Sequence, residues 1–576
     1  MQKNIFWLLL IVFFVLFSLV PTFYEVSFRE KLQGRSFELV HNYITDYHFY
    51  LSRIRQGAEG RWSVIEQYTS EPHRGSYVQV FYLLLGKPVG FMSDKAYASQ
   101  LAYHLSRGVL GLFLLGSIVW VVRKSFSSFL FQILAFFTIV TASTWPKVVV
   151  VHGVYRFGGY MAWWTLMDSL QRITFLPHLL IGQFLLVILL VVGCGRVYTE
   201  KPWQWILWGG VALLLGMIFP PGLVFVGVCY GIVSIIEILS DTKRLIIAKK
   251  RDEWIYTSIL PKFCIGVVSI PSLLYFKLLF IDYPWKRLVE LDVLHPLPFQ
   301  FTEYIQALGP TLPLGILGLL LVFIRKEKKL YWVNAWVITW IVLLWVFQFI
   351  PEQLPLRFSE MVPHIPLGIL TAYLFYQAFL FVQRFFKKQP KYLVSGIWYL
   401  VWKIGKSVSY IILNTLYLIL LSLGLGVMAS SIFWQKDFID QKVGAGYPAI
   451  SMNNYIVYPL QGFMDGISYI EKNTPRNTVI LSLLTAGNYI PPFAGRTVYV
   501  GHDNTVDGDT KLARAKQFFR GDMKKEDALM WLKETGITYI FFGPQEKEEG
   551  KMSELHTRYP FLQKMFQNTD VTIYQW

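Results

Sequence analysis

The sequence predicts a polytopic α-helical membrane protein that ends in a small soluble α/β domain. Hydrophobic residues make up 54% of its 576 residues and charged residues only 16%, a composition that is rare among soluble globular proteins. Apolar stretches long enough to cross a bilayer, about 20 residues, recur along most of the chain. From about residue 435 onward the composition becomes that of a soluble domain.

We expect about eleven membrane-spanning helices, because a helix needs about 20 apolar residues to cross the hydrocarbon core. The first apolar run resembles a signal peptide, but residues 18–21 form a poor cleavage site, so we interpret it as an uncleaved span. The fifth and sixth runs are separated by a Pro-Gly segment, residues 219–222, and form either two spans or a hairpin that does not fully cross. The runs begin near Ile5, Leu101, Phe129, Leu176, Trp203, Leu223, Tyr256, Leu312, Tyr331, Leu367 and Tyr410.

The formal net charge of +17 has two explanations, nucleic-acid binding or basic loops beside membrane spans. The basic residues collect in short loops between apolar runs, at residues 123–124, 243–251, 325–329 and 384–406. Such loops face the cytoplasm in membrane proteins. This places the N-terminus in the cytoplasm and, with an odd number of spans, the C-terminal domain outside the cell membrane; no nucleic-acid partner is expected.

The pattern divides the chain into a transmembrane domain, residues 1–434, and an external soluble domain, residues 435–576. The transmembrane domain carries a long external loop, residues 24–100, and a cytoplasmic interfacial helix over residues 392–406. In the soluble domain we expect helices over residues 463–472, 509–520 and 525–535, and strands over residues 478–484, 496–501, 537–542 and 571–576. Strands that alternate with helices imply a sheet that is at least partly parallel.

Asp46 is the first candidate for chemistry, since it lies in the long external loop near the start of a predicted amphipathic helix. The apolar residues of that helix recur at helical spacing at Tyr47, Tyr50, Leu51 and Ile54. Taken alone, the residues favour a capping role for Asp46, because an aspartate satisfies free N–H groups at a helix start. The alternative is a carboxylate that acts as a general base at the membrane surface.

Two other sets of polar residues outside the apolar runs each have two possible interpretations. Glu66 and Glu71, later in the same loop, either orient an acceptor or are simply solvated. The turn-rich segment 501–509 contains His502 and Asp503 and either binds a metal ion or caps the helix that follows it.

A second cluster precedes the fourth apolar run. Asp168 and Arg172 are four residues apart on one predicted helical face, where an ion pair contributes a few tenths of a kcal/mol, about 0.2–0.5. His178 lies inside the span, where ionisable groups usually face the protein interior. We therefore expect this trio to line a cavity, with Arg172 and His178 contacting a lipid phosphate and Asp168 acting as a second acid.

A third cluster, Arg357, Glu360 and His364, lies just before the tenth apolar run. One interpretation is that these residues anchor the span at the membrane interface. The other is that Arg357 lies over the phosphate of a lipid-linked substrate.

The whole arrangement resembles the type-C glycosyltransferase superfamily, GT-C, which includes the protein mannosyltransferases, the aminoarabinose transferases of lipid A and the oligosaccharyltransferases. The resemblance covers the topology: an uncleaved first span, a long acidic and aromatic first external loop, many further spans and an external C-terminal domain. Its local matches are the Asp46 segment, the Pro-Gly segment at residues 219–222 and residues 355–358.

The resemblance implies transfer of a sugar, with inversion, from a polyprenyl-phosphate donor to a glycan, lipid or protein acceptor at the external face. It makes Asp46 and Asp168 the catalytic candidates and allows for a divalent metal ion of unknown identity. A lone Asp46 stands where many members have an acidic pair, which counts against a metal-dependent role. The substrate-binding candidates are Arg172, His178, Arg357, Glu71 and Glu360.

Two other functions remain open from the sequence. A membrane transporter or lipid flippase needs charged residues along a path through the bilayer, whereas the charges singled out above cluster at the external ends of spans. A non-catalytic scaffold would use its soluble domain only to recruit partners.

The predicted topology can be tested with reporter fusions. Alkaline phosphatase fused after Trp576 should be active and green fluorescent protein fused there should be dark, because the predicted C-terminus is external. The same reporters fused after Lys329, in a predicted cytoplasmic loop, serve as the control and should give the opposite signals. An inactive alkaline phosphatase after Trp576 would place the C-terminal domain in the cytoplasm and would contradict the predicted external active site.

Overall fold

The computed structural model describes residues 2–151, 153–158, 167–195, 200–245, 248–294, 301–350, 354–387, 397–444 and 457–576. Its internal contacts divide the chain into two compact units, which are described separately. The helical unit contains Met1–Val20, Arg107–Ser272 and Leu297–Asp437. The mixed unit contains Pro21–Ser106, Leu273–Pro296 and Phe438–Trp576, so the first predicted external loop and the predicted soluble domain belong to the same unit.

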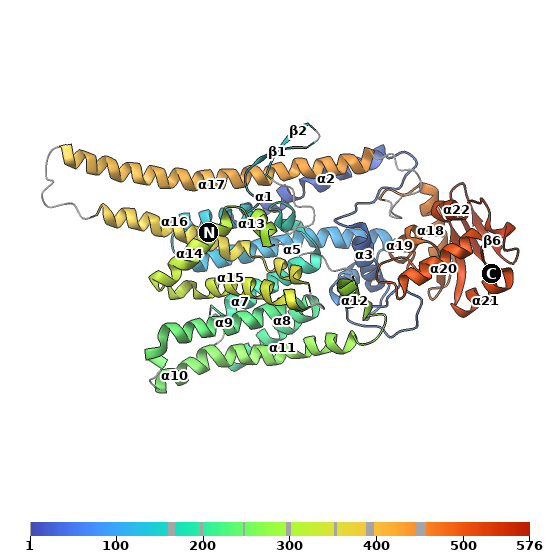
Figure 1. Cartoon of the computed structure of the whole chain (residues 1–576), viewed down its shortest axis with the longest axis horizontal. Coiled ribbons are helices and arrows are strands. Elements are labelled where there is room, and N and C mark those ends of the chain that lie inside the picture. Colours follow the sequence, from blue (N-terminus) through green and yellow to red (C-terminus); the bar gives the residue numbers. More distant parts are fainter. Residues whose placement is uncertain are drawn as a thin grey trace. The chain divides into compact units, whose positions relative to one another are not determined.

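The helical unit is built almost entirely from long apolar helices (Figure 1). The helices that contribute to it are α1 (Gln2–Ser18), α5 (Lys95–Ser125), α6 (Phe129–Thr141), α7 (Pro177–Gly193), α8 (Pro202–Ile218), α9 (Pro220–Leu245), α10 (Ala248–Trp254), α11 (Leu260–Leu279), α13 (Phe301–Leu308), α14 (Thr311–Arg325), α15 (Tyr331–Val346), α16 (His364–Phe385) and α17 (Ile397–Gly444). Short 3-10 helices precede α7, α15 and α16, at η4 (Gln171–Thr174), η6 (Lys328–Leu330) and η8 (Pro355–Glu360).

The described residues contain six helices long and apolar enough to cross a membrane, or up to eight if each of two bent helix pairs is one span. The bent pairs are α1 with Val20–Lys31, at 43°, and α13 with α14, at 92°. Helices α6, α7 and α8 are apolar but shorter. The chain is therefore a polytopic helical membrane protein, and the count of about eleven spans remains a prediction.

Glycines allow the closest helix contacts of the helical unit, between α14 and α16. A Cβ atom added at Gly318 would lie 2.2 Å from the backbone oxygen of Leu370, and one at Gly315 would lie 2.7 Å from the side chain of Leu367. Membrane helices pack through small residues because lipid tails provide no hydrophobic driving force between them. The α14–α16 contact is of this kind.

A β-hairpin is the one sheet among the described residues of the helical unit. Its strands, β1 (Val148–Val151) and β2 (Val154–Phe157), pair antiparallel and lie beside α17 in Figure 1. Arg156 forms an ion pair with Asp437 of α17 at 2.7 Å, and the Phe157 N–H donates to Ser430 Oγ. The hairpin is therefore held to α17 by both charge and hydrogen bonding.

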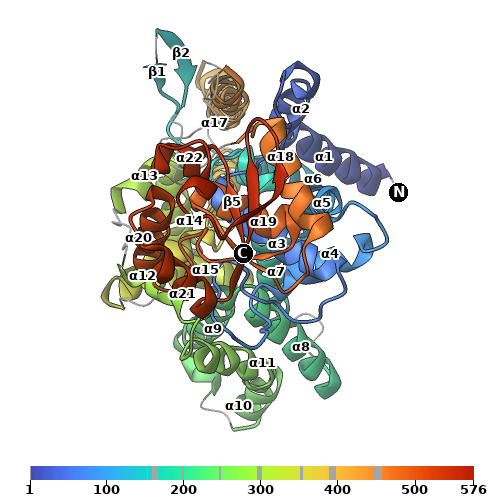
Figure 2. The same cartoon turned by 90° about the vertical axis from the view of Figure 1, so that its right-hand side faces the viewer.

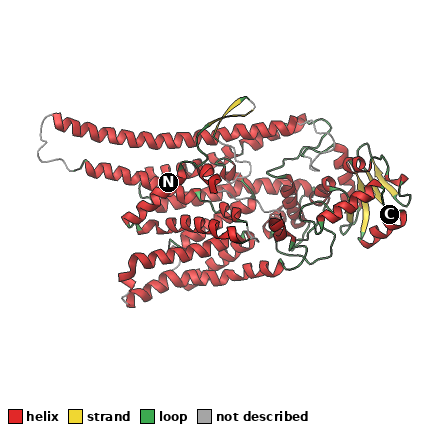
Figure 3. Ribbon diagram, in the orientation of Figure 1, coloured by secondary structure: helices red, strands yellow, loops and turns green. Residues whose placement is uncertain are grey.

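The mixed unit contains a five-stranded sheet with the strand order β4-β3-β5-β7-β6, and Figure 3 shows these strands grouped near the C-terminus. Strand β3 pairs parallel with β4 and β5, whereas β7 pairs antiparallel with β5 and β6, so the sheet is partly parallel as predicted. The strands are β3 (Val479–Leu481), β4 (Thr497–Val498), β5 (Ile537–Phe542), β6 (Gln563–Gln567) and β7 (Thr572–Gln575). The helices are α2 (Val20–Val26), α3 (Ile44–Ala58), α4 (Val80–Gly86), α12 (Arg287–Leu294), α18 (Gln461–Asn473), α19 (Leu484–Ala494), α20 (Gly508–Arg520), α21 (Lys525–Glu534) and α22 (Pro544–Gly550).

Every predicted helix and strand of the C-terminal domain is present, and the prediction missed three elements. Helix α19 was missed because it contains Pro491 and Pro492, which normally exclude a helix interior. Helix α22 and strand β6 were missed because they are short and polar.

The interfacial helix predicted over residues 392–406 is not a separate element. Residues 397–406 form the beginning of α17, which continues without a break for 48 residues, while residues 392–396 lie outside the described ranges. Between Ile397 and Tyr410 only Gly405 weakens a helix, and a single glycine is tolerated.

The glycine contact between α14 and α16 can be tested by adding one methyl group. Gly318→Ala should destabilise the protein by about 1–3 kcal/mol, because the new Cβ collides with backbone that cannot rotate away. Gly116→Ala on α5 is the control, since a Cβ there meets nothing within 4 Å. Thermal unfolding of both variants in the same detergent measures the difference, and equal melting temperatures would contradict the close contact.

Candidate functional site

The predicted site residues fall into two groups, one in each unit. Asp46 and Glu71 belong to the mixed unit, and Asp168, Arg172, His178, Arg357 and Glu360 belong to the helical unit. Convergence of the two groups on one cavity remains a prediction, and each group is described within its own unit.

Asp46 lies in the first turn of α3 and is partly exposed. The predicted helix is confirmed, but Tyr43 rather than Asp46 occupies the N-cap position, and no side-chain hydrogen bond caps that helix end. An acidic side chain in a first turn interacts favourably with the helix dipole by about 0.3–1 kcal/mol. The Asp46 carboxylate therefore sits at the electropositive end of α3 without being its N-cap.

The rest of α3 is buried on nearly all sides, which the amphipathic pattern did not predict. Helix α3 packs against α19 of the same unit, and the two lie close together in Figure 2. His48 is fully buried, with its Nε2 atom 2.5 Å from Glu38 Oε1 and its Nδ1 atom 2.6 Å from Asn488 Oδ1. The face expected to meet solvent is thus covered by the C-terminal domain.

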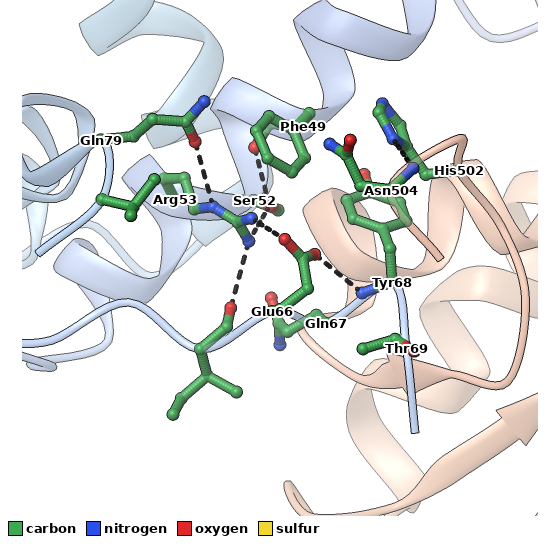
Figure 4. A network of polar contacts seen from close by, with 12 residues as sticks. Phe49, Ser52, Arg53, Glu66, Gln67, Tyr68, Thr69, Gln79, His502 and Asn504 are labelled. Atoms are coloured by element: carbon green, nitrogen blue, oxygen red, sulfur yellow. Dashed lines mark hydrogen bonds and ion pairs between the residues drawn. The ribbon is translucent and has the colours of Figure 1, made fainter. Parts of the chain in front are cut away.

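Arg53 is the centre of a buried polar network (Figure 4). Its Nη2 atom donates to Glu66 Oε2 at 2.6 Å, its Nη1 atom donates to the Ile65 carbonyl at 3.1 Å, and its Nε atom donates to Gln79 Oε1 at 3.4 Å. The guanidinium also lies 4.1 Å from the centre of the Phe49 ring. A buried arginine with this many partners fixes the rotation of α3.

Arg55, two residues further along, ties α3 to the C-terminal domain. Its Nη1 atom donates to the Phe493 carbonyl at 2.7 Å and its Nη2 atom to Glu471 at 2.5 Å, while its Nε atom donates to Glu59 at 2.8 Å. The partners of Arg55 therefore come from α3 itself, from α19 and from α18. The sequence did not predict these contacts, although two arginines beside the apolar residues Leu51 and Ile54 were a signal.

The interpretation that the two loop glutamates are simply solvated is wrong for Glu66, and for Glu71 it leaves out an ion pair. Glu66 is only 2% exposed because it is the counter-ion of Arg53. Glu71 forms an ion pair with Lys511 at 2.5 Å and accepts a hydrogen bond from Thr69. Burial raises the pKa of Glu71, but the hydrogen bonds from Lys511 and Thr69 outweigh it, so the net pKa is lowered and the carboxyl stays ionised.

The surroundings of Asp46 include Tyr43, which the sequence did not single out, and Asp503 of the turn-rich segment. Tyr43 is 55% exposed, and its pKa is raised by burial and by the charges of Asp503 and Asp46. His502 is buried and stacks on Phe49 at 5.0 Å, and burial lowers its pKa to about 3, so its imidazole is neutral. The predicted capping role of this segment is confirmed only in part, because Asp507 is the N-cap residue of α20 but makes no side-chain cap.

Asp168 is held inside the helical unit by hydrogen bonds to both carboxylate oxygens. Its Oδ1 atom accepts from the N–H groups of Leu170 and Gln171, and its Oδ2 atom accepts from Ser431 on α17 at 2.8 Å. This pattern closes a turn before η4 rather than forming the single helical face predicted with Arg172. A role for Asp168 as a second acid remains a prediction.

Arg172 is buried beside a small cavity of the helical unit. Its Nη2 atom donates to the carbonyls of Ile139 and Val140, and its Nη1 atom has no hydrogen-bond partner among the described residues. The cavity is lined by Arg172, Gln183, Ser359, His364 and apolar side chains, and its volume is about 20 Å³. That space holds a water molecule but not a phosphate group.

His178 and Arg357 lie close enough for their charges to interact, although they are distant in sequence. Arg357 is exposed and His178 is partly exposed. Glu360 is buried, and its backbone carbonyl accepts a hydrogen bond from Gln183 of α7 at 3.0 Å. The start of α7 and the segment before α16 therefore meet, and the structure brings these predicted residues together within the helical unit.

The donor set for a metal ion is incomplete around Asp46. Across the described ranges, no group of three or more His, Cys, Asp or Glu side chains could hold a metal ion. A divalent ion usually needs several oxygen ligands at one point. We therefore assign no catalytic step to a metal ion.

The chain is similar to known proteins in its fold but not in its sequence. No protein-family model matches the chain, and no protein of curated function is similar to it in sequence. The oligosaccharyltransferase AglB of Archaeoglobus fulgidus, solved with an inhibitory peptide and a dolichol-phosphate, is similar in structure, with a TM-score of 0.50 and 11% identity over 94% of this chain and 70% of that chain.

ArnT of Cupriavidus metallidurans is a looser structural neighbour. Its apo form is 12% identical, covers 98% of this chain and 97% of its own, and has a TM-score of 0.47. Its complex with undecaprenyl phosphate has a TM-score of 0.46, and neither value is high enough to carry an argument. The similarity to AglB shows that the chain has the fold of this oligosaccharyltransferase.

Proposed function

We propose that the protein transfers a sugar from a polyprenyl-phosphate donor to an acceptor hydroxyl or amine at the external face of the membrane, with inversion at the anomeric carbon. The observation that carries this proposal is the position of Asp46. Its carboxylate is partly exposed, while the helix that bears it is locked by the buried Arg53–Glu66 ion pair. The AglB structure contains a dolichol-phosphate and a peptide, which supports a lipid-linked donor and a separate acceptor.

We propose a topology of about eleven spans with the N-terminus in the cytoplasm. The soluble domain from residue 435 onward is then external and shares a compact unit with the first external loop. This arrangement brings the Asp46 carboxylate and the C-terminal domain to the side on which polyprenyl-phosphate sugars would be used.

In the proposed reaction Asp46 acts as the general base. The acceptor oxygen or nitrogen attacks the anomeric carbon from the face opposite the phosphate, and its proton passes to the Asp46 carboxylate. The bond between the anomeric carbon and the phosphate oxygen breaks, and the polyprenyl phosphate leaves with the electron pair. Tyr43, which shares the charge environment of Asp46, lies next to the acceptor position in this proposal.

The leaving phosphate carries negative charge and needs cationic partners. We assign the positive charge to Arg357 and a hydrogen bond from the imidazole N–H to His178, because they lie near each other and neither is fully buried. Arg172 is buried beside a cavity of about 20 Å³, so it contributes to phosphate binding only when that cavity widens. Glu360 orients the segment that carries Arg357, Asp168 is the second acid, and Glu71 orients the acceptor.

The catalytic role of Asp46 can be separated from any structural role by replacing it with asparagine. Asp46→Asn should lower turnover about a hundredfold to ten-thousandfold, the usual contribution of a general base, because the amide oxygen is not basic. Its stability should fall by no more than about 1 kcal/mol, since only a favourable charge near the helix dipole is lost. Turnover is measured with purified protein and radiolabelled polyprenyl-phosphate sugars.

The matched control is Asp94→Asn, which replaces another aspartate at a helix start. Asp94 Oδ1 accepts from the Tyr97 N–H, and asparagine caps as well as aspartate does, so this variant should keep wild-type turnover. Wild-type turnover in Asp46→Asn would exclude Asp46 as the base and favour a non-catalytic scaffold.

The phosphate-binding role of Arg357 predicts a change in donor affinity rather than in stability. Arg357→Gln should raise KM for the donor about tenfold to a hundredfold, because a charge-assisted hydrogen bond is lost. Arg357→Lys should recover part of that affinity, since the positive charge is retained. Arg123→Gln, at the predicted cytoplasmic end of α5, is the control, and an equal KM in the Arg357 and Arg123 variants would contradict the assignment.

A further inference from the structure

A cavity in the helical unit that takes no part in the proposed reaction has room for a ligand. It lies where the α5–α6 turn, the α14–α15 connection and α16 meet, and its volume is about 150 Å³, against about 20 Å³ for the cavity beside Arg172. A water molecule needs about 10–15 Å³ of such space, so this cavity can hold a polyatomic group. Its lining residues are Ser125, Phe126, Ser127, Ser128, Glu327, Lys329, Leu330, Tyr373 and Tyr376.

One part of this cavity has the chemistry of a phosphate site. Helix α6 begins at Phe129, and its N-cap residue, Ser128, makes no side-chain cap. The free N–H groups and the dipole of a helix start attract anions. Ser127, Ser128 and Lys329 line the cavity and add hydroxyl donors and a positive charge, and Lys124 lies close enough to interact with the charge of Lys329.

The hydroxyl group of Tyr373 is an independent sign of a ligand. The Tyr373 side chain lines the cavity and is only 3% exposed. Its hydroxyl group makes no hydrogen bond of standard geometry among the described residues, although the Gln377 side chain, one turn along α16, lies near it. A buried hydroxyl without a partner is costly, so a ligand in the cavity would satisfy it.

The same cavity also contains groups that would bind a cation. Glu327 lines it and is near enough for its charge to act on Tyr373. The rings of Phe126 and Tyr376 also line it and meet edge to face, with their centres 6.3 Å apart. A carboxylate next to aromatic rings is a typical environment for an ammonium group. Glu327 would repel a simple anion, so the cavity is complementary to a group that carries both charges.

We propose that this cavity binds a phosphoethanolamine group. The phosphate lies at the start of α6 with Ser127, Ser128 and Lys329, and the ammonium group lies between Glu327 and the Tyr376 ring. The group comes either from the headgroup of phosphatidylethanolamine or from a soluble phosphoethanolamine ester. This binding is independent of sugar transfer, since none of the lining residues belongs to the proposed active site.

The proposal is tested by titrating delipidated full-length protein in detergent and counting bound molecules by native mass spectrometry. The probes are dioleoyl phosphatidylethanolamine, phosphatidylcholine and phosphatidylglycerol, together with soluble phosphoethanolamine and inorganic phosphate. We expect phosphatidylethanolamine to bind about tenfold more tightly than the other two lipids, which lack the primary ammonium group. Competition by soluble phosphoethanolamine would identify the headgroup alone as sufficient, and its failure to compete would identify the lipid as the source.

Four variants separate the ammonium-binding part of the cavity from its phosphate-binding part. Glu327→Gln should abolish the preference for phosphatidylethanolamine over phosphatidylglycerol, and Lys329→Met should weaken the binding of both lipids about tenfold. Tyr373→Phe keeps the ring and removes only the hydroxyl group, so it should weaken binding without lowering the melting temperature of the lipid-free protein. Lys328→Met, a neighbouring exposed lysine outside the lining, is the control and should bind like wild type.

The proposal would be overturned by any of three results. Phosphatidylglycerol could bind as tightly as phosphatidylethanolamine to the wild-type protein. Glu327→Gln could retain the wild-type lipid preference. Lys328→Met could weaken binding as much as Lys329→Met does.

Discussion

The burial of charged side chains on α3 is the constraint on which the candidate site depends. Arg53 and Arg55 are almost completely buried, and a buried charge is tolerated only when it is paired and hydrogen-bonded. Glu66 and Glu471 supply those pairs from segments far apart in the chain. Removing one partner of such a pair typically costs about 3–5 kcal/mol, so the Arg55–Glu471 pair couples the folding of residues 24–100 to that of the C-terminal domain.

The buried ion pairs immobilise α3 and thereby hold Asp46 in place, while the Asp46 side chain stays partly exposed. A general base must be held close to its productive position, and a side chain at the end of an immobilised helix meets that requirement better than one on a free loop. His48 and Arg55 are occupied by hydrogen bonds to Asn488 and to the Phe493 carbonyl, so both side chains hold α3 in place. In the proposed reaction they position the helix, and Asp46 carries the chemistry.

The helical unit combines tight contacts with polar cavities. Glycines bring α14 and α16 into backbone contact, whereas Arg172 and Tyr373 each leave a buried polar atom without a partner among the described residues. Satisfied polar groups hold a membrane bundle together, and unsatisfied ones mark places where another molecule can bind. The Arg172 cavity has a volume of only about 20 Å³, while the cavity beside Tyr373, at about 150 Å³, has room for a headgroup.

The sequence by itself determined the membrane class, the helix that carries Asp46 and the partly parallel C-terminal sheet, because hydropathy and periodicity are local properties. It could not show that Glu66 is buried, since that depends on Arg53 approaching from α3. It also assigned Asp168 and Arg172 to one helical face, whereas they lie in a turn and in η4 and are held by Ser431 of α17 and the carbonyls of α6, with their charges still close enough to interact. Tertiary structure decided these partners because burial of a charge is set by what packs over it, and the partners range from Glu66, 13 residues from Arg53, to Ser431, 263 residues from Asp168.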